Sequence, residues 1–246
     1  MLLAIDIGNT RTKFGVYEND SSVCRFDVPT VRTNTAADIF QPQLKQPIHA
    51  VVISSVVPEL AATYRKFAAE HFSLEPIFVD NSFDFNLKIN YFPPENLGVD
   101  RLVAAYAAIE KYGETCIVGD FGTATTIDVV TVNREFLGGI IAPGMNTMSE
   151  SLSWKTAKLP LIKIEKPACV IGDSTLTAIQ SGIYFGYIGL VDGIIERMID
   201  ELGAKPKVVA TGGFASLIAE SSVKIEVVDE HLLLEGLRLI YEKRFR

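Results

Sequence analysis

The sequence has few cysteines and no Cys-x-x-Cys pair. Its three cysteines, Cys24, Cys116 and Cys169, stand far apart in the chain. Zinc sites and dithiol redox centres use closely paired cysteines, so both kinds of site are excluded. The three histidines also lack metal-ligand spacing. We expect three buried, reduced thiols.

A surplus of basic residues is missing as well. The chain has 23 Lys and Arg against 30 Asp and Glu, a formal net charge of -7. A protein that binds a phosphate backbone needs a basic face, so nucleic acid is not expected as a partner. Hydrophobic residues make up 48% of the 246 residues, which is enough for a buried core and excludes a disordered chain.

No apolar run is long and uninterrupted enough for a membrane span. The best candidate, residues 176–191, is shorter than the roughly 20 residues that a span needs and contains Thr177, Gln180 and several glycines. We expect a buried helix there. The first residues form a strand pattern without a basic leader, so a cytoplasmic protein with no membrane partner is expected.

The two common glycine-rich phosphate loops, GxGxxG and GxxxxGK[ST], are absent from the sequence. Those loops open a helix. Here the first glycine lies in AIDIGNTRTKFGVY, residues 4–17, between strand-like runs at 2–7 and 13–17. The pattern predicts a β-hairpin with Gly8-Asn9-Thr10 in its turn and Asp6 near the end of its first strand.

Strand and helix patterns alternate along the rest of the chain, which is typical of the α/β class. An irregular loop is predicted over residues 81–96, because the consecutive prolines of YFPPEN at its end (91–96) forbid regular strand pairing. Strands are predicted at 50–53, 77–79, 115–119, 207–210 and 225–228, and helices at 58–72, 99–113, 146–158, 174–202, 214–220 and 232–241.

The hairpin motif recurs 114 residues later in the chain. Two copies at this distance suggest two related halves with a boundary near residue 115. Setting IDIGNTRTKFGV (5–16) over GDFGTATTIDVV (119–130) pairs Asp6 with Asp120, Gly8 with Gly122, Asn9 with Thr123, and Thr12 with Thr126.

These turns have the composition of a phosphate site. Backbone N–H groups and hydroxyls in a Gly-, Asn- and Thr-rich turn suit phosphate oxygens. A carboxylate beside phosphates requires a cation, so Asp6 and Asp120 fit as partners of metal ions, directly or through water. Such turns are also ordinary hairpin chemistry. Two copies, and Thr211-Gly212-Gly213 after a later strand, favour phosphate binding.

The arrangement resembles the superfamily of actin, sugar kinases and heat-shock chaperones. The resemblance implies an α/β fold of two duplicated actin-like (ribonuclease H-like) lobes, residues 1–114 and 115–246. Each lobe would have a mixed sheet flanked by helices, with a nucleotide cleft between the lobes.

Within that superfamily the sequence is similar to type III pantothenate kinases. The similarity implies ATP-dependent phosphorylation of pantothenate to 4′-phosphopantothenate, the first step of coenzyme A biosynthesis. The alternatives are a non-enzymatic nucleotide-binding regulator of the same fold, or another small-molecule kinase. The similarity rests on DIGNTRTKFG (6–15), YFPPENLGVDRLVAAYAA (91–108), DFGTATTIDVV (120–130) with GGIIAPGM (138–145), and STLTAIQSG (174–182).

Asp100 and Arg101 stand where GVDR opens a helix. From the residues alone, Asp100 fits a helix cap as well as a catalytic carboxylate, and Arg101 fits a surface ion pair as well as a clamp on a carboxylate or amide. The resemblance implies that Asp100 is the general base and that Arg101 binds pantothenate. Positioning counts more than basicity in a loose phosphoryl-transfer transition state, so a raised pKa is not required.

The resemblance assigns further contacts. From the residues alone, Lys13 fits a solvated strand lysine, Tyr91 a half-buried aromatic and Thr175 a routine helix start. The implied pantothenate contacts are Tyr91, Gly98, Val99, Asp100, Arg101 and Thr175. The implied ATP contacts are Asp6, Ile7, Gly8, Asn9, Thr10, Arg11, Thr12, Lys13 and Thr123.

Two cations and a second subunit follow from the same resemblance. Asp6 is expected near the Mg²⁺ of ATP, and Asp120 is expected to bind a monovalent cation, K⁺ or NH₄⁺. A homodimer is expected in which the neighbouring subunit completes the pantothenate pocket. The helices at 146–158 and 174–202 are candidate interface elements, and Trp154 is expected in the core or at an interface.

Overall fold

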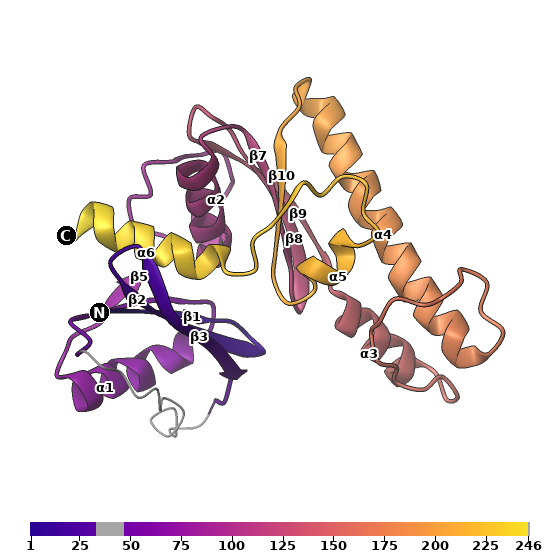
Figure 1. Ribbon diagram of the computed structural model, residues 1–246, viewed down its shortest axis with the longest axis horizontal. Coiled ribbons are helices and arrows are strands. Elements are labelled where there is room, and N and C mark those ends of the chain that lie inside the picture. The colour runs from indigo at the N-terminus through magenta and orange to yellow at the C-terminus, as the bar shows by residue number, and fades with distance from the viewer. Residues whose placement is uncertain (33–46, 246) are drawn as a thin grey trace. The chain divides into compact units, whose positions relative to one another are not determined.

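The computed structural model of the chain describes residues 1–32 and 47–245 (Figure 1). The chain divides into two compact units. The first unit comprises Met1–Lys111 and Leu232–Arg246, and the second comprises Tyr112–His231.

The first unit is built on a five-stranded sheet in the order β3-β2-β1-β4-β5. Strand β1 runs antiparallel to β2 and parallel to β4, so the sheet is mixed. The elements of this unit are β1 (Leu2–Ile7), β2 (Arg11–Glu18), β3 (Ser21–Pro29), β4 (Ala50–Ser55), the 3-10 turn η2 (Pro58–Leu60), α1 (Ala61–Phe72), β5 (Ile77–Val79), β6 (Lys88–Ile89), the 3-10 turn η3 (Pro94–Asn96), α2 (Val99–Tyr112) and α6 (Leu232–Arg244).

The second unit repeats this topology. Its strands follow the order β11-β10-β7-β8-β9, and β7 runs antiparallel to β8 and parallel to β10. The elements of this unit are β7 (Cys116–Phe121), β8 (Ala124–Val130), β9 (Glu135–Pro143), α3 (Met145–Lys155), α4 (Thr175–Leu202), β10 (Lys207–Thr211), α5 (Ala215–Ala219) and β11 (Val227–Val228). The expected α/β fold with mixed sheets flanked by helices is confirmed.

The side chains of β1 alternate between the two faces of the sheet. Leu3, Ile5 and Ile7 belong to one hydrophobic cluster with Tyr64 and Phe67 of α1. Because successive strand residues point to opposite faces, Asp6 lies on the other face of the sheet. The buried β1 residues therefore fix the direction in which the Asp6 carboxylate points.

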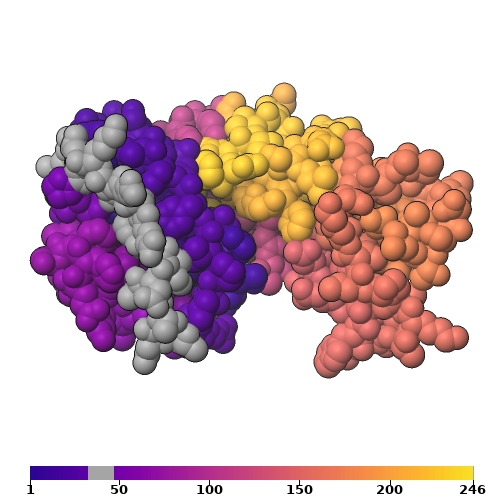
Figure 2. Space-filling model, turned by 60° about the horizontal axis from the view of Figure 1, so that its bottom comes forward, coloured from indigo at the N-terminus to yellow at the C-terminus, as the bar shows by residue number. Residues whose placement is uncertain are grey.

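The division of the chain differs from the expected halves at the C-terminal end. Helix α6 was assigned by sequence to the second lobe, but it packs on β1 and β4 of the first unit. Its Gly236 lies close to Val103 of α2, and Glu235 forms an ion pair with Arg25 of β3. Figure 2 shows the yellow C-terminal residues against the indigo N-terminal ones. Long-range packing, which no local pattern reveals, decides the place of this helix.

Most predicted helices are present with small shifts in their ends. Helix α3 ends at Lys155 rather than at residue 158, and α6 continues to Arg244. Strand β3 was not predicted, since its exposed alternation gives no strong apolar signal. The expectation of three buried cysteines was wrong: Cys116 is buried, Cys24 is half-buried and Cys169 is exposed.

Helix α4 is only partly buried. Its length and composition would allow it to cross a membrane. One such helix is weak evidence for a membrane span, because core helices of soluble proteins pass the same test. One side carries Ile183, Tyr184 and Tyr187 into the core of the second unit. The other side is exposed and includes Gly182, Gly186 and Gly189. The expected burial therefore holds for one face of α4.

Trp154 near the end of α3 is not a core residue. Its side chain is 81% exposed. Trp154 was expected in the core or at an interface, and its exposure excludes the core.

Candidate active site

The first hairpin turn closes tightly over residues 8–11. The Gly8 N–H donates to the Arg11 carbonyl oxygen at 3.0 Å, and a Cβ on Gly8 would lie 2.9 Å from that oxygen. Only glycine fits this approach without a shift. The Thr30 hydroxyl donates to the Gly8 carbonyl at 2.7 Å, and the Thr30 N–H donates to the Thr10 carbonyl at 2.8 Å. Thr30, the residue that follows β3, therefore holds the turn in one shape.

The side chains of this turn have different surroundings. Asn9, Thr10 and Arg11 are exposed, and Arg11 is ion-paired with Asp27. Ile7 and Thr12 are fully buried, so contacts with a ligand at the turn would come from their backbone groups.

Asp6 is a buried carboxylate at the end of β1. It is 6% exposed, and its Oδ1 accepts a hydrogen bond of 2.9 Å from the Ser54 hydroxyl. Burial raises the pKa of Asp6, the Lys13 charge and the Ser54 hydrogen bond lower it, and the Asp100 charge raises it further. The two carboxylates and Lys13 therefore act on one another within the first unit.

Lys13 stands opposite Asp6 in the register of β1 and β2. Directly opposed residues on antiparallel strands share a face, so Lys13 points to the Asp6 side of the sheet. It is half-buried. Lys13 is therefore not a fully exposed strand lysine, and its charge acts on Asp6 and on Asp100.

Asp100 lies in the first turn of α2. Its Oδ1 accepts a 2.8 Å hydrogen bond from the Arg101 N–H. Burial raises the pKa of Asp100, while backbone hydrogen bonding and the charges of Arg101 and Lys13 oppose the rise. A Cβ on Gly98 would lie 2.4 Å from Oδ1 of Asp100, so glycine at this position leaves room for the carboxylate. Asp100 therefore bonds to the backbone at the start of the helix and is also partly shielded from water, so the two interpretations do not exclude each other.

Arg101 is buried beside Tyr91. The residue is 5% exposed, and the carbon of its guanidinium lies 5.2 Å from the centre of the Tyr91 ring. An exposed ion pair is therefore excluded for Arg101. The cation–π contact brings the Pro-rich loop against the start of α2. Gly98 is half-buried and Val99 is buried in the same segment.

The second hairpin turn covers residues 122–124. The Gly122 N–H donates to the Ala124 carbonyl at 3.1 Å, and Thr123 is exposed. The Thr123 carbonyl accepts from the Gly144 N–H at 3.0 Å and from the Thr147 hydroxyl at 2.7 Å. The start of α3 therefore holds this turn.

Gly212 brings β10 close to Asp120. Its φ is +94°, and a Cβ there would lie 2.4 Å from Oδ1 of Asp120 and 2.7 Å from the Phe121 backbone. Asp120 itself is half-buried near the end of β7. The glycine is required both by its backbone angle and by the space that Asp120 occupies.

The two hairpins differ by one residue in their turns. The last pair of the first hairpin is Ile7 with Thr12, and that of the second is Phe121 with Thr125. Thr12 therefore corresponds to Thr125, not to Thr126 as the sequence alignment predicted. Both corresponding threonines are fully buried. A fixed offset fails past the turn because the second turn is shorter.

Thr175 is the first residue of α4, and it is exposed. The helix is capped by its neighbour Ser174, whose hydroxyl accepts from the Thr177 N–H at 3.3 Å, while the Thr177 hydroxyl accepts from the Ser174 N–H at 3.0 Å. Thr175 lies outside this capping box.

The described residues contain no group of three or more His, Cys, Asp or Glu side chains that could hold a metal ion. Mg²⁺ in nucleotide enzymes is commonly bound by one or two carboxylates together with phosphate oxygens and water. The single carboxylates Asp6 and Asp120 fit that kind of site.

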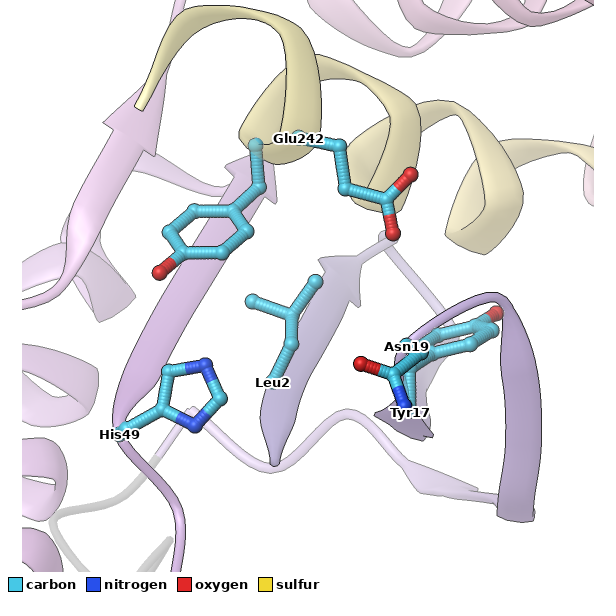
Figure 3. Close-up of a pocket in the computed structure, with 6 residues that line it drawn as sticks. Leu2, Tyr17, Asn19, His49 and Glu242 are labelled. Atoms are coloured by element: carbon cyan, nitrogen blue, oxygen red, sulfur yellow. The ribbon is translucent and has the colours of Figure 1, made fainter. Parts of the chain in front are cut away.

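A cavity of about 100 Å³ lies at the other end of β1 from Asp6. Figure 3 shows Leu2 of β1 among Tyr17, Asn19, His49 and, from α6, Glu242. None of the predicted site residues lines this cavity, so it is not part of the candidate site.

Ser54 is the residue that sequence reasoning missed. The run AVVISS forms β4 and ends in two hydroxyl residues, whereas the sequence predicted a strand over 50–53 only and left both serines outside it. The sequence signal that could have found Ser54 is a hydroxyl residue directly after a buried apolar run. This signal points to the site only once β1 is known to pair with β4, because that pairing places Ser54 beside Asp6.

Comparison with known proteins identifies close relatives over nearly the whole chain. A family model described as type III pantothenate kinase matches residues 2–197. A type III pantothenate kinase from Koribacter versatilis (strain Ellin345) is 42% identical over 262 residues, 99% of this chain and 96% of the relative. One from Anaeromyxobacter sp. (strain Fw109-5) is 45% identical over 252 residues, 99% of both chains.

Solved structures share the fold at lower identity. A Campylobacter jejuni protein described as a Baf family transcriptional activator aligns with a TM-score of 0.63 at 22% identity and covers 98% of both chains. An inorganic polyphosphate/ATP-glucomannokinase from Arthrobacter sp. strain KM aligns with a TM-score of 0.51 at 15% identity, covering 99% of this chain and 98% of that one. At these identities the likeness shows the fold alone.

Proposed function

The chain belongs to the type III pantothenate kinase family, and from that premise we propose how its residues carry out the ATP-dependent phosphorylation of pantothenate. The reaction belongs to coenzyme A biosynthesis, and the product is 4′-phosphopantothenate. One observation supports the assignment of roles above all: Lys13 stands opposite Asp6 in the register of β1 and β2, on the same face of the sheet, and its charge also lowers the pKa of Asp100.

Asp100 is the general base in this proposal. Its carboxylate is held at Oδ1 by the Arg101 N–H, which leaves the second oxygen for the pantothenate hydroxyl. Burial raises the pKa of Asp100, so it is a better proton acceptor than an exposed aspartate. In phosphoryl transfer the proton leaves late, and this fixed position contributes more than basicity.

The two hairpin turns bind the phosphates of ATP. The backbone of residues 6–13 and Thr123 supplies N–H groups and hydroxyls, and Lys13 supplies a positive charge beside Asp6. Asp6 is the carboxylate near Mg²⁺, directly or through water. The magnesium ion neutralises charge on the phosphates when ATP is bound.

Pantothenate is held by the loop and helix start around Asp100. Arg101 provides a buried cation for the carboxylate or amide of pantothenate, and its contact with Tyr91 fixes its orientation. Gly98 and Val99 line the same segment. Thr175 offers a hydroxyl that the helix cap does not use.

Asp120 binds a monovalent cation, K⁺ or NH₄⁺. The half-buried carboxylate gives one hard oxygen ligand beside the second phosphate turn. Gly212 and Gly144 keep neighbouring backbone close to this turn without side chains in the way.

The active form is a homodimer in which the neighbouring subunit completes the pantothenate pocket. Helix α4 supports this proposal, because its exposed residues between 176 and 189 are apolar or glycine, and an added Cβ on these glycines would meet nothing within 4 Å. A second copy of α4 could approach these residues closely. The exposed Trp154 of α3 would then lie at an interface. We place the enzyme in the cytoplasm, without a nucleic acid or membrane partner.

A coupled ADP-release assay tests the proposal. Purified protein with MgATP, with and without K⁺ or NH₄⁺, is compared on pantothenate and on a panel of sugars and polyols. We expect ADP release that depends on pantothenate and on the monovalent cation. Release that is indifferent to pantothenate, or that follows a sugar, would favour another small-molecule kinase. Nucleotide binding without any turnover would favour a non-enzymatic regulator.

A further inference from the structure

Each unit carries a hydroxyl residue beside the aspartate of its phosphate hairpin. Asp6 pairs in register with Ser54 on the parallel strand β4, and Asp120 pairs in register with Thr211 on the parallel strand β10. Paired residues on neighbouring strands point to the same face of a sheet. The repeated fold therefore places a hydroxyl next to a carboxylate twice.

Only the first of these pairs forms a hydrogen bond. The Ser54 hydroxyl donates to Oδ1 of Asp6 at 2.9 Å, and both residues are buried. The Thr211 hydroxyl is also buried, but it has no hydrogen-bond partner among the residues that the structure describes. Register alone therefore does not produce the bond, and the Ser54–Asp6 contact is specific to the first unit.

The neighbouring hydroxyl of Ser55 behaves differently. It accepts from the Val57 N–H at 3.0 Å and lies 3.1 Å from the Val57 carbonyl, so it shapes the end of β4. Two consecutive serines thus have separate roles, one toward the site and one toward the local turn.

A fixed donor has a strong effect on a buried carboxylate. Asp6 is only 6% exposed, so water cannot easily replace the Ser54 hydroxyl that donates to its Oδ1 at 2.9 Å. A hydrogen bond to an ionised group also fixes the rotation of the carboxylate.

We propose that Ser54 is a positioning residue for Asp6, whose hydroxyl occupies Oδ1 and leaves the second oxygen for the magnesium ion of MgATP. This inference rests on the proposed role of Asp6. Ser54 touches neither substrate nor phosphate and acts only through the Asp6 carboxylate.

Calorimetric binding of ADP, with and without Mg²⁺, tests this role in the full chain. Ser54→Ala should weaken MgADP binding on the order of tenfold, the effect of one hydrogen bond to a charged group, and leave Mg²⁺-free ADP binding unchanged. It should also raise the Mg²⁺ concentration for half-maximal activity. Ser54→Thr, which keeps the hydroxyl, should restore both quantities, and the control Ser55→Ala should match the unchanged chain.

Two results with Ser54→Ala alone would overturn the proposal. One is MgADP binding by folded Ser54→Ala at the unchanged affinity. The other is an equal loss of ADP binding with and without Mg²⁺, which shows a merely structural role. If Ser54→Ala does not fold, Ser54→Cys, with similar volume and a weak donor, gives the same comparison.

Asp6→Asn separates this inference from the proposed function. If Asp6→Asn loses Mg²⁺-dependent binding and Ser54→Ala adds nothing in that background, Ser54 acts through Asp6. A further loss in the double variant would overturn the positioning role. Unchanged Mg²⁺ dependence in Asp6→Asn alone would instead refute the proposed role of Asp6, and with it this inference, while leaving Asp100 as a base untouched.

Discussion

Lys13 stands directly opposite Asp6 across β1 and β2, and its charge opposes the rise in pKa of that carboxyl group. The same lysine acts on Asp100, which lies at the start of α2. Asp6 is buried and Asp100 is half-buried, and their like charges repel, so a shared cation makes it easier for both carboxylates to be ionised. Lys13 therefore acts both on the carboxylate of the first hairpin and on the carboxylate at the start of α2.

Replacing Lys13 by Met should disturb both carboxylates. We expect the KM for ATP to rise about tenfold, through loss of one charge-assisted contact. The acid limb of the kcat/KM profile should move to higher pH, because the lost cation no longer lowers the pKa of Asp100. Steady-state kinetics between pH 5 and 9 measures both changes. Lys66→Met on the exposed side of α1 is the control, and equal behaviour of the two variants would contradict the role of Lys13.

Replacing Asp100 by Asn should remove the general base while keeping the shape of the side chain. We expect kcat to fall about 10²- to 10⁴-fold, with ATP binding within about twofold of the unchanged chain. The control is Glu95→Gln, an exposed acid in η3 of the preceding loop. A kcat within tenfold of the original would show that Asp100 is not the general base and only bonds to the start of the helix.

The raised pKa of Asp100 also predicts a stability effect. Its folded pKa lies above the ordinary 3.8, so the folded chain holds this proton more tightly than the unfolded chain. Stability is therefore lost as the pH rises from 3.8 through the folded pKa. Asp100→Asn should be more stable than the original chain above this range, by about 1 kcal/mol, and equally stable below it. Urea unfolding at several pH values measures the difference, and no gain at neutral pH would count against a buried ionised carboxylate.

Gly212 and its neighbour Gly213 offer a matched pair for the second hairpin. Gly212→Ala places a Cβ 2.4 Å from Oδ1 of Asp120 at a positive φ, whereas a Cβ on Gly213 meets nothing within 4 Å. We expect Gly212→Ala to lower the free energy of unfolding by more than about 1 kcal/mol and to weaken activation by K⁺. Gly213→Ala should do neither. If Gly212→Ala and Gly213→Ala change the free energy of unfolding and the activation by K⁺ to the same extent, the space beside Asp120 is not critical.

The proposed dimer can be tested on the exposed side of α4. Gly186→Leu should leave the monomer folded, since an added side chain meets no neighbour within the chain. It should block close approach of a second α4. Sedimentation velocity should then show a monomer, while the original chain and the control Ala62→Leu on α1 sediment as dimers. A dimer that survives Gly186→Leu would place the interface elsewhere.

Local patterns account for a large part of the fold. The helices and the first hairpin follow from residue spacing and turn composition, and the repeated DxG motif correctly predicts two units of the same topology. The edge strand β3 was missed because its side chains are mostly exposed and alternate weakly.

The motifs select candidate site residues but do not give their arrangement. The roles assigned to Asp6, Asp100 and Asp120 stay predictions. The motifs did not show that Lys13 faces Asp6, because a strand pattern does not reveal which of its two faces is buried. They also misaligned Thr12, since a turn shortened by one residue changes the register of every residue after it.

The sequence by itself determined the local elements, because helix periodicity, turn residues and strand alternation act over a few neighbouring positions. Only the tertiary structure decided that Ser54 bonds to Asp6, 48 residues away, and that helix α6 packs with the first unit. Both depend on how distant segments pair and bury their surfaces. A hydrogen bond between strands exists only after the strands have taken their register, so no local pattern contains it.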